Sequence, residues 1–288
     1  MSFGLALAGG GARGAAHAGV LLALEEAGLV PDSIAGTSAG SIVAGLYAAG
    51  NTPKEISSMM NEMAEHPQNF LDADLHGLLR GITHYFKVHS FDYTGLLKGD
   101  RLERYLQEKT NGMSIKDAKI PIVIPVVDLN SGLTVAYTNT LRKKQQISRV
   151  QWKTDILLSE AMRASASYPG VFKPKYINGM CLVDGGVTDV LPVDLLMASG
   201  ETNILAVDVS HAYKMPETNS LFEITAHSLS IMSSYLKEYH SVGEKLLLKP
   251  VLPEDAGLLS LERMPECFKA GYEYTRSAMP AILKIFKK

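Results

Sequence analysis

The stretch Phe3-Gly4-Leu5-Ala6-Leu7-Ala8-Gly9-Gly10-Gly11-Ala12-Arg13-Gly14 decides the fold, because a run of glycines joins two unlike patterns. Its first six residues are typical of a buried strand, and the Ala/Leu-rich residues 15–27 that follow predict a helix. Glycines at such a junction let the backbone turn tightly and leave N–H groups uncovered at the helix N-terminus. Those N–H groups suit a phosphate or the oxyanion of a tetrahedral intermediate, and the pattern alone leaves both open.

A second glycine-containing turn lies at Gly36-Thr37-Ser38-Ala39-Gly40. The preceding residues 33–37 predict a short strand, and residues 39–49 predict a small-residue helix. A serine between glycines at a strand-to-helix turn is typical of a nucleophile elbow, which exposes the hydroxyl above the strand end. The alternative is an ordinary helix N-cap, a position that serine favours.

The third turn is Asp184-Gly185-Gly186, which follows a hairpin predicted around Asn178-Gly179 between residues 175–177 and 180–183. A serine nucleophile needs a neighbouring group that removes its proton. An aspartate at a strand end is a candidate for that base, although Asp and Gly are also common in turns without any catalytic role. The conjunction of the three turns favours a serine hydrolase.

Two other classes of α/β protein fit the sequence less well. Residues 9–14 match the G-x-G-x-x-G pattern of dinucleotide-binding folds, but no acidic residue ends the second predicted strand to bind a ribose. The α/β-hydrolases place their serine after several strands and need a late histidine. Only one β-α unit and one strand precede Ser38. The late histidines His211, His227 and His240 lie outside any obvious glycine-flanked turn at a strand end.

Composition narrows the remaining classes. The chain has 288 residues, 28 Lys and Arg against 30 Asp and Glu, 46% hydrophobic residues and 20% charged residues. This is typical of a globular protein, and the net charge of −2 gives no indication of nucleic-acid binding. Cys181 and Cys267 are too few for a disulfide scaffold or a structural zinc site, which favours a cytoplasmic protein without a metal or other cofactor. Neither a signal peptide nor a transmembrane helix is expected.

Strand-like runs alternate with helical patterns along the chain, which predicts an α/β domain. We expect one domain over residues 1–288, with an irregular excursion at 66–99 that is a candidate lid and a helical extension at 215–288. Thr52-Pro53-Lys54-Glu55 predicts a capped helix start. The other predicted elements are strands at 120–128, 133–137 and 204–209, an extended segment at 246–252, and helices at 155–164, 222–239 and 266–286.

The three turns, together with Ala164-Ser165-Ala166-Ser167-Tyr168-Pro169-Gly170-Val171-Phe172-Lys173-Pro174, resemble the patatin-like phospholipase family, in particular its compact bacterial members. Order and spacing match over about residues 3–210, whereas the residues after about 215 match no family motif. The resemblance implies a three-layer α/β/α sandwich around a mainly parallel central sheet. It also implies a Ser-Asp dyad without histidine, in which Ser38 is the nucleophile and Asp184 the base.

The resemblance also assigns roles to the glycine turns. The backbone N–H groups implied for the oxyanion hole are those of Gly9, Gly10, Gly11 and Ala12. The residues with implied supporting roles are Arg13, Gly36, Gly40, Gly185 and Gly186. We expect Arg13 to brace the glycine loop by bonding backbone carbonyls, with contact to a phosphate head group as the alternative. Ser165, Ser167 and His17 are expected to be structural or to line the pocket.

The expected function is hydrolysis of lipid carboxylic esters through a covalent acyl-enzyme, on a phospholipid, a lysophospholipid or an acylglycerol. Three alternatives stay open: a catalytically weak regulatory or adaptor protein on the same fold, an esterase for small non-lipid esters, and a peptidase. Peripheral membrane contact is a further expectation, through apolar residues of 66–99 or through the basic amphipathic end at 279–288. The sequence leaves the oligomeric state open.

Overall fold

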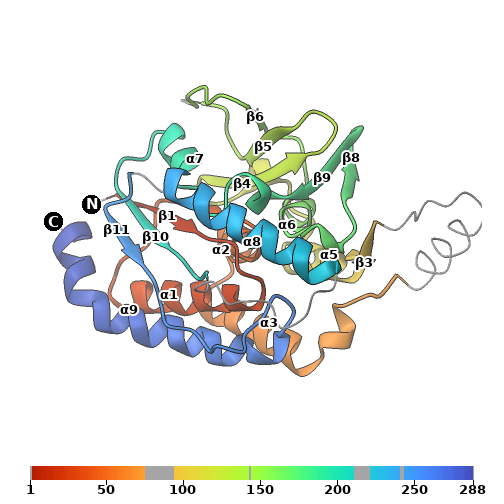
Figure 1. Ribbon diagram of the computed structural model, residues 1–288. Helices are drawn as coiled ribbons and strands as arrows, with labels where there is room; N and C mark the ends of the chain where they lie inside the picture. Colours follow the sequence, from red (N-terminus) through yellow and green to blue (C-terminus); the bar gives the residue numbers. More distant parts are fainter. Residues whose placement is uncertain (1, 75–93, 143, 211–220, 241–242, 288) are drawn as a thin grey trace, which may run out of the picture.

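The structure is a computed structural model that describes residues 2–74, 94–142, 144–210, 221–240 and 243–287. The strands of its main sheet are β1 (Gly4–Leu7), β2 (Ser33–Gly36), β4 (Ile122–Asp128), β5 (Leu133–Thr138), β6 (Val150–Lys153), β8 (Lys175–Ile177), β9 (Met180–Asp184), β10 (Ile204–Val207) and β11 (Leu246–Leu248). They run in the order β11-β10-β1-β2-β4-β5-β6, with β9 also paired to β4 and β8 to β9 (Figure 1). The pairs β4–β5, β4–β9 and β8–β9 are antiparallel, and the other pairs of this sheet are parallel. The sheet is therefore mainly parallel, as predicted.

Helices cover both faces of this sheet. They are α1 (Ala15–Glu26), α2 (Ala39–Ala49), α3 (Pro53–Glu65), α5 (Asp100–Lys109), α6 (Leu158–Ser165), α7 (Val193–Ala198), α8 (Leu221–His240) and α9 (Met264–Phe286). Successive strand residues point to opposite faces. Leu5 and Leu7 accordingly join the larger core with α1, α2, α3 and α9, whereas Ala6 joins a smaller core with α7. The predicted α/β/α sandwich is therefore confirmed, with layers of unequal thickness.

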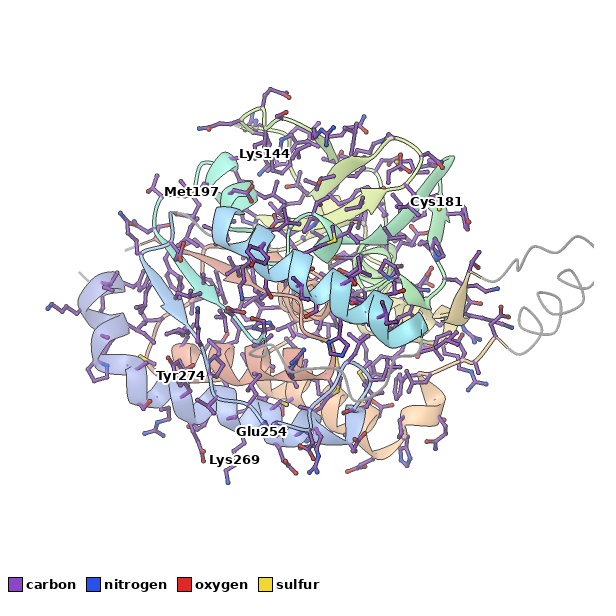
Figure 2. All side chains as sticks on the ribbon, in the orientation of Figure 1. Lys144, Cys181, Met197, Glu254, Lys269 and Tyr274 are labelled. Carbon is purple, nitrogen blue, oxygen red and sulfur yellow. The ribbon has the colours of Figure 1, made fainter. Side chains whose placement is uncertain are left out.

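The last helix, α9, packs closely against α1. A Cβ atom at Gly19 would overlap the Phe268 carbonyl oxygen, and one at Gly271 would overlap the Ala16 carbonyl oxygen, so the two glycines let the helix backbones approach. At the end of α9, Phe286 is buried, with its ring 5.2 Å from another buried ring, that of Phe3. The amphipathic end thus docks on the domain. Lysines such as Lys269 extend from the outer side of α9 (Figure 2).

The central strand β4 positions both candidate catalytic turns. β2 pairs in parallel with the start of β4, where Ala35 lies opposite Val123. β9 pairs antiparallel with the end of the same strand, where Asp184 lies opposite Val126. Both strands therefore end at nearly the same level of β4, and the turn that carries Ser38 meets the turn that carries Asp184.

Part of the candidate lid lies outside the described residues, namely 75–93. The described residues before it pack inward, because Phe70 is buried with its ring 4.7 Å from that of Tyr105 on α5. After it, β3 (Gly95–Leu97) pairs with β7 (Gly170–Phe172) in a small separate sheet. Each helix in the described ranges is too short or too polar to span a bilayer. Those ranges also hold no group of three His, Cys, Asp or Glu side chains placed to bind a metal ion.

Candidate active site

Ser38 sits in a strained turn between β2 and α2. Its φ of 53° and ψ of −123° are rarely adopted by residues that carry a side chain, and such strain clusters at functional sites. The turn requires glycines on both sides, since a Cβ at Gly36 would overlap the Gly40 carbonyl and one at Gly40 would lie 2.5 Å from the Leu7 carbonyl oxygen. Ser38 occupies the N-cap position, but its side chain makes no capping hydrogen bond there. The hydroxyl is thus not used as an ordinary helix cap.

A second serine fixes the backbone of this turn. The Ser38 N–H donates to Ser165 Oγ at 3.0 Å, and the Ser165 hydroxyl donates to the Pro125 carbonyl on β4 at 2.7 Å. The Ser41 hydroxyl donates to the Ser38 carbonyl at 2.5 Å. Ser165 is fully buried at the end of α6, so it connects the turn to both α6 and the central strand. This is the structural role expected for it.

Asp184 is the last residue of β9 and is only 2% exposed. Its Oδ1 accepts the Gly186 N–H at 2.7 Å. Burial raises the pKa of its carboxyl group to about 6, and the neighbouring Ser38 hydroxyl and Gly186 N–H oppose that rise. Oδ2 makes no hydrogen bond of standard geometry with a described residue, although Ser38 is near enough to lower the pKa. Loose alignment of this kind is common in enzymes without bound substrate.

Two of the four N–H groups expected in the oxyanion hole already have acceptors. The Gly9 N–H donates to the Val190 carbonyl at 2.9 Å, and the Ala12 N–H donates to the Leu258 carbonyl at 3.1 Å. For the two glycines between them, the described residues supply no such acceptor. Their N–H groups are therefore the ones that remain to bind an oxyanion.

The shape of the glycine loop depends on residues that are distant in the sequence. Gly11 has a φ of +58°, and a Cβ there would overlap the Leu258 carbonyl, so only glycine fits. Arg13 Nε donates to the Gly10 carbonyl at 3.2 Å, which is the bracing role expected for Arg13. Burial also lowers the pKa of Arg13.

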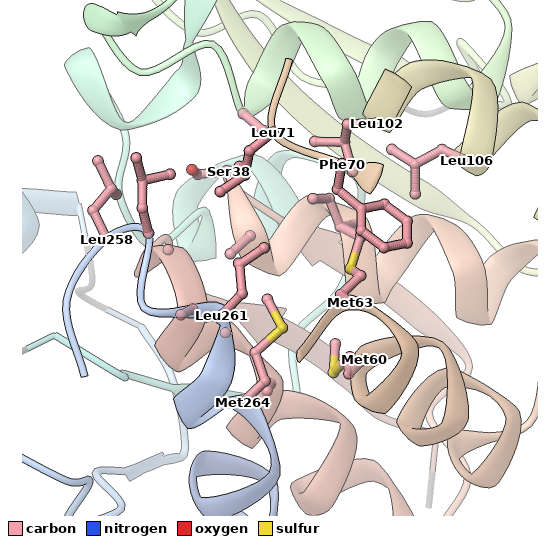
Figure 3. Close-up of a pocket in the computed structure, with 18 of the residues that line it drawn as sticks. Ser38, Met60, Met63, Phe70, Leu71, Leu102, Leu106, Leu258, Leu261 and Met264 are labelled. Carbon is pink, nitrogen blue, oxygen red and sulfur yellow. The ribbon is translucent and has the colours of Figure 1, made fainter. Parts of the chain in front are cut away.

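An apolar cavity extends from Ser38 into the larger core (Figure 3). Figure 3 shows Ser38 at one side and methionine, leucine and phenylalanine side chains around the remaining wall. The labelled lining residues are Met60, Met63, Phe70, Leu71, Leu102, Leu106, Leu258, Leu261 and Met264. They come from α3, the segment that follows it, α5, the segment before α9 and the start of α9. Phe70 and Leu71 belong to the candidate lid expected from the sequence, whereas the other labelled lining residues except Ser38 were not predicted as site residues.

A second, more polar cavity meets the first at Ser38, Gly11, Tyr168 and Leu258. The polar cavity has a volume of about 1570 Å³ and the apolar cavity one of about 880 Å³, and both volumes include space that is open to solvent. Its remaining walls include the glycine loop, Asp184 and one side of α8. The α8 residues on this wall include His227, Ser230, Ser233, Ser234 and Lys237. His227 therefore lines the cavity, although the sequence placed it outside the candidate site.

The other predicted site residues also belong to this region. Gly185 packs so closely on β4 that a Cβ would overlap the Pro125 carbonyl. The Ser167 hydroxyl accepts a hydrogen bond from buried Arg163 at 2.6 Å, a structural contact. His17 is fully buried, and its Nε2 donates to the Ala8 carbonyl at 2.8 Å. Burial lowers the pKa of His17 to about 4, so the ring is neutral and structural, as expected.

A serine in a strained strand-to-helix turn, with a buried carboxylate beside it and unpaired backbone N–H groups nearby, is an arrangement typical of serine hydrolases. On an α/β/α sandwich with so few strands before the serine, it defines a class distinct from the α/β-hydrolases. The model of the patatin-like phospholipase family matches residues 5–197, and the chain belongs to this family.

Individual relatives agree with this assignment. The chain is similar to lysophospholipase NTE1 of Saccharomyces cerevisiae (34% identity over 215 residues) and of Mycosarcoma maydis (31% over 210 residues), with 73% of the chain covered in each. It is also similar to an uncharacterized NTE family protein of Mycobacterium bovis, 28% identical over 79% of the chain. The chain spans 11%, 10% and 54% of these proteins, respectively.

A solved structure shows the same fold. The crystal structure of VipD from Legionella pneumophila aligns with 97% of this chain and 67% of that chain, with a TM-score of 0.52. The sequence identity is 15%, so the likeness concerns the fold alone.

Proposed function

We propose that the chain is a lipid acyl hydrolase that cleaves carboxylic esters through Ser38 and Asp184. The observation that carries the proposal is the apolar cavity that begins at Ser38, because it offers an acyl chain a dry path beside the nucleophile. The names of the fungal relatives suggest a lysophospholipid as the first substrate to test. The polar cavity on the other side of Ser38 suits the head group.

The chemistry proceeds in two steps. Ionised Asp184 accepts the Ser38 proton while Ser38 Oγ attacks the ester carbonyl, and the N–H groups of Gly10 and Gly11 bind the resulting oxyanion. Asp184 then returns the proton to the departing alcohol, and the acyl group stays on Ser38. Water then attacks the acyl-enzyme, with Asp184 again accepting the proton. Asp184 returns that proton to Ser38, and the fatty acid is released. Loss of one oxyanion donor typically lowers kcat by about 10²–10³-fold.

The setting we propose is the cytoplasmic side of a lipid surface. Both cysteines, Cys181 and Cys267, are free, which suits a reducing compartment. Of the alternatives, an esterase for small substrates is disfavoured by the apolar cavity beside Ser38, which such a substrate does not need. The intact pair of Ser38 and Asp184 disfavours a catalytically weak adaptor.

A fluorophosphonate probe tests the proposal most directly. We expect the probe to label Ser38, as located by peptide mass, and lysophosphatidylcholine to release fatty acid. Ser38→Ala should abolish both reactions, and Asp184→Asn should slow both by at least about 10³-fold.

The matched control is His227→Ala, which changes the histidine that lines the same cavity. It should retain labelling of Ser38, because the proposed base is a carboxylate. Full ester hydrolysis by Ser38→Ala, or loss of labelling in His227→Ala with Asp184→Asn still active, would overturn the dyad.

A further inference from the structure

Helix α8 lies in front of the sheet in Figure 1 and lines the candidate active site. Its two sides differ in the side chains that they carry. Its inner side faces the polar cavity and is held by polar contacts. The Ser233 hydroxyl donates to the Gly186 carbonyl at 3.2 Å, next to Asp184. Lys237 Nζ donates to Asp208 Oδ2 at 2.7 Å and to Ser210 Oγ at 2.6 Å. These contacts fix α8 to the catalytic turn and to the segment after β10.

Over residues 224–237, whose side chains the structure describes, the outer side of α8 is apolar and carries no formal charge. Its large exposed side chains are Ile224, Ile231, Met232 and Tyr235, which are 49%, 40%, 57% and 65% exposed. Their spacing places them along one side of a helix. The other exposed positions between 224 and 237 are occupied by serine or threonine. Lys237 is the one formally charged side chain in that range, and it pairs inward with Asp208.

Contact with water does not stabilise an apolar helix surface of this kind. None of residues 224–237 is buried, and none belongs to a hydrophobic core of the described chain. Helices normally gain most of their stability from packing an apolar side against the protein. The contrast with α9 is direct, since α9 buries Phe286 and exposes charged residues such as Lys269 and Glu273 (Figure 2). The apolar side of α8 instead points away from the protein.

We propose that the outer side of α8 docks on the lipid surface that supplies the substrate, with Ile231, Met232 and Tyr235 inserted at the boundary between head groups and acyl chains. The inference rests on the proposed function. A lipid leaving that surface beside α8 would enter the polar cavity that α8 lines together with Ser38 and Asp184. Ser230 and Ser234 of α8 are exposed and also line this cavity, so the docking surface borders the candidate site.

The charge pattern specifies the kind of lipid surface. Interfacial helices that depend on anionic lipid carry Lys or Arg along their polar side. The outer side of α8 offers no such residue between 224 and 237. Binding is therefore driven by burial of apolar side chains, and it should occur on zwitterionic phosphatidylcholine without added anionic lipid.

Vesicle binding by catalytically inactive protein tests this surface separately from the chemistry. In the Ser38→Ala background, we compare co-sedimentation with phosphatidylcholine vesicles for the unchanged helix and for Ile231→Ser, Met232→Ser, Tyr235→Ser combined. The combined variant should partition at least about tenfold more weakly. The control combines Val30→Ser and Leu141→Ser, which are 58% and 54% exposed. Val30 precedes β2 and Leu141 follows β5, so both lie at the end of the sheet away from Ser38. It should bind like the parent.

Hydrolysis of vesicle lipid provides a second readout, measured in protein that retains Ser38. The combined variant should lose vesicle hydrolysis in proportion to its lost binding, while its kcat/KM on a monomeric short-chain ester stays within about twofold of the unchanged protein. In the Ser38→Ala background, Tyr235→Trp should place an indole that brominated phosphatidylcholine quenches.

Three results would overturn the proposal: no vesicle binding by the parent, equal binding by the combined variant, or an equal loss in the control. A parent that elutes as a dimer and a combined variant that elutes as a monomer, without vesicle binding, would assign the surface to a second copy instead. If vesicles are bound but no ester is cleaved, the proposed function fails and the docking surface stands.

Discussion

Asp184 is the residue on which the candidate chemistry depends, because a base must be ionised and burial opposes ionisation. The carboxyl group is 2% exposed, yet the Ser38 hydroxyl and the Gly186 N–H favour its charged form. The resulting pKa of about 6 leaves the group ionised at neutral pH and far more basic than an exposed aspartate. A carboxylate can therefore do here what a histidine does in most serine hydrolases.

The pH dependence of hydrolysis follows from this pKa. Because only ionised Asp184 accepts the Ser38 proton, kcat/KM for a soluble ester should rise about tenfold per pH unit below pH 6 and level off above about pH 7. A pH–rate profile under conditions far below KM measures the midpoint. His17 does not titrate in this range, since its pKa lies at about 4. A midpoint that shifts in His227→Ala would assign the titration to that histidine.

The same residue should make the folded protein less stable as the pH rises, whereas the rate of hydrolysis should increase. The folded-state pKa of Asp184, about 6, exceeds the ordinary value of 3.8, so the folded protein binds this proton more tightly than the unfolded chain. Its contribution to stability is greatest below pH 4, declines between about pH 4 and 6, and stays low above that. Asp184→Asn should therefore raise the free energy of unfolding at pH 8 by about 1–3 kcal/mol, with no gain at pH 4. Urea unfolding at both pH values measures this difference, and equal stability at pH 8 would contradict it.

At the scale of elements, α3 and α5 form the wall of the apolar cavity that lies away from Ser38 (Figure 3). Met60 and Met63 enter it from α3, and Leu102 and Leu106 enter it from α5. Methionine adapts its shape readily, so this wall suits a flexible chain. The far wall of the cavity should therefore determine which acyl chains are accepted.

Met63→Trp should shorten the accepted chain. The larger ring fills the cavity beyond Ser38, so the ratio of kcat/KM for a 16-carbon ester to that for a 4-carbon ester should fall at least about tenfold. Overpacking should also cost about 1–3 kcal/mol of stability. The control, Met197→Trp, adds the same ring on α7, outside the cavity, at a residue that is 39% exposed. An unchanged ratio in Met63→Trp would place the acyl chain elsewhere.

The elements with local sequence signals were predictable, and those without such signals were not. Thr52 and Glu55 form the predicted capping box, with the Glu55 N–H donating to Thr52 Oγ1 at 3.3 Å. Helix α5 was missed because Gly99 precedes it with no side-chain cap, and only Leu102 and Leu106 of its residues are buried.

The same distinction applies within the site. Ser38 and Asp184 lie in turns that glycines mark in the sequence. The occupation of the Ala12 N–H by the Leu258 carbonyl depends on a segment almost at the other end of the chain. No local pattern reveals such a contact, so the sequence suggested four oxyanion donors where the structure leaves two.

At the scale of the whole molecule, residues beyond the family match contribute to both the core and the candidate site. The match ends at residue 197, yet α9 covers α1, and Leu258 lines both cavities. Within the helical extension expected at 215–288, α9 is thus part of the core, and α8 and Leu258 line the candidate site.

Gly271→Ala tests how closely α9 packs on α1. Helix propensity alone predicts a gain of about 1 kcal/mol, whereas overlap with the Ala16 carbonyl predicts a net loss of about 1–3 kcal/mol. Urea unfolding decides the sign. Ser277→Ala, at an exposed position on the same helix, is the matched control and should not destabilise the protein. A more stable Gly271→Ala variant would mean that the helices lie further apart.

The shared edge of β4 makes the geometry of the candidate nucleophile and the candidate base independent of the length of chain between them. Ala35 and Asp184 are each placed against β4, at Val123 and Val126. Insertions in the loops between the turns leave that spacing intact, so relatives of very different length can keep one working site. An extra residue inside β4 between these two points would instead move the pair apart by about 3.3 Å and reverse the side on which one partner lies. The loops can therefore change in length without moving the pair, whereas the three-residue step from Val123 to Val126 in β4 must be kept.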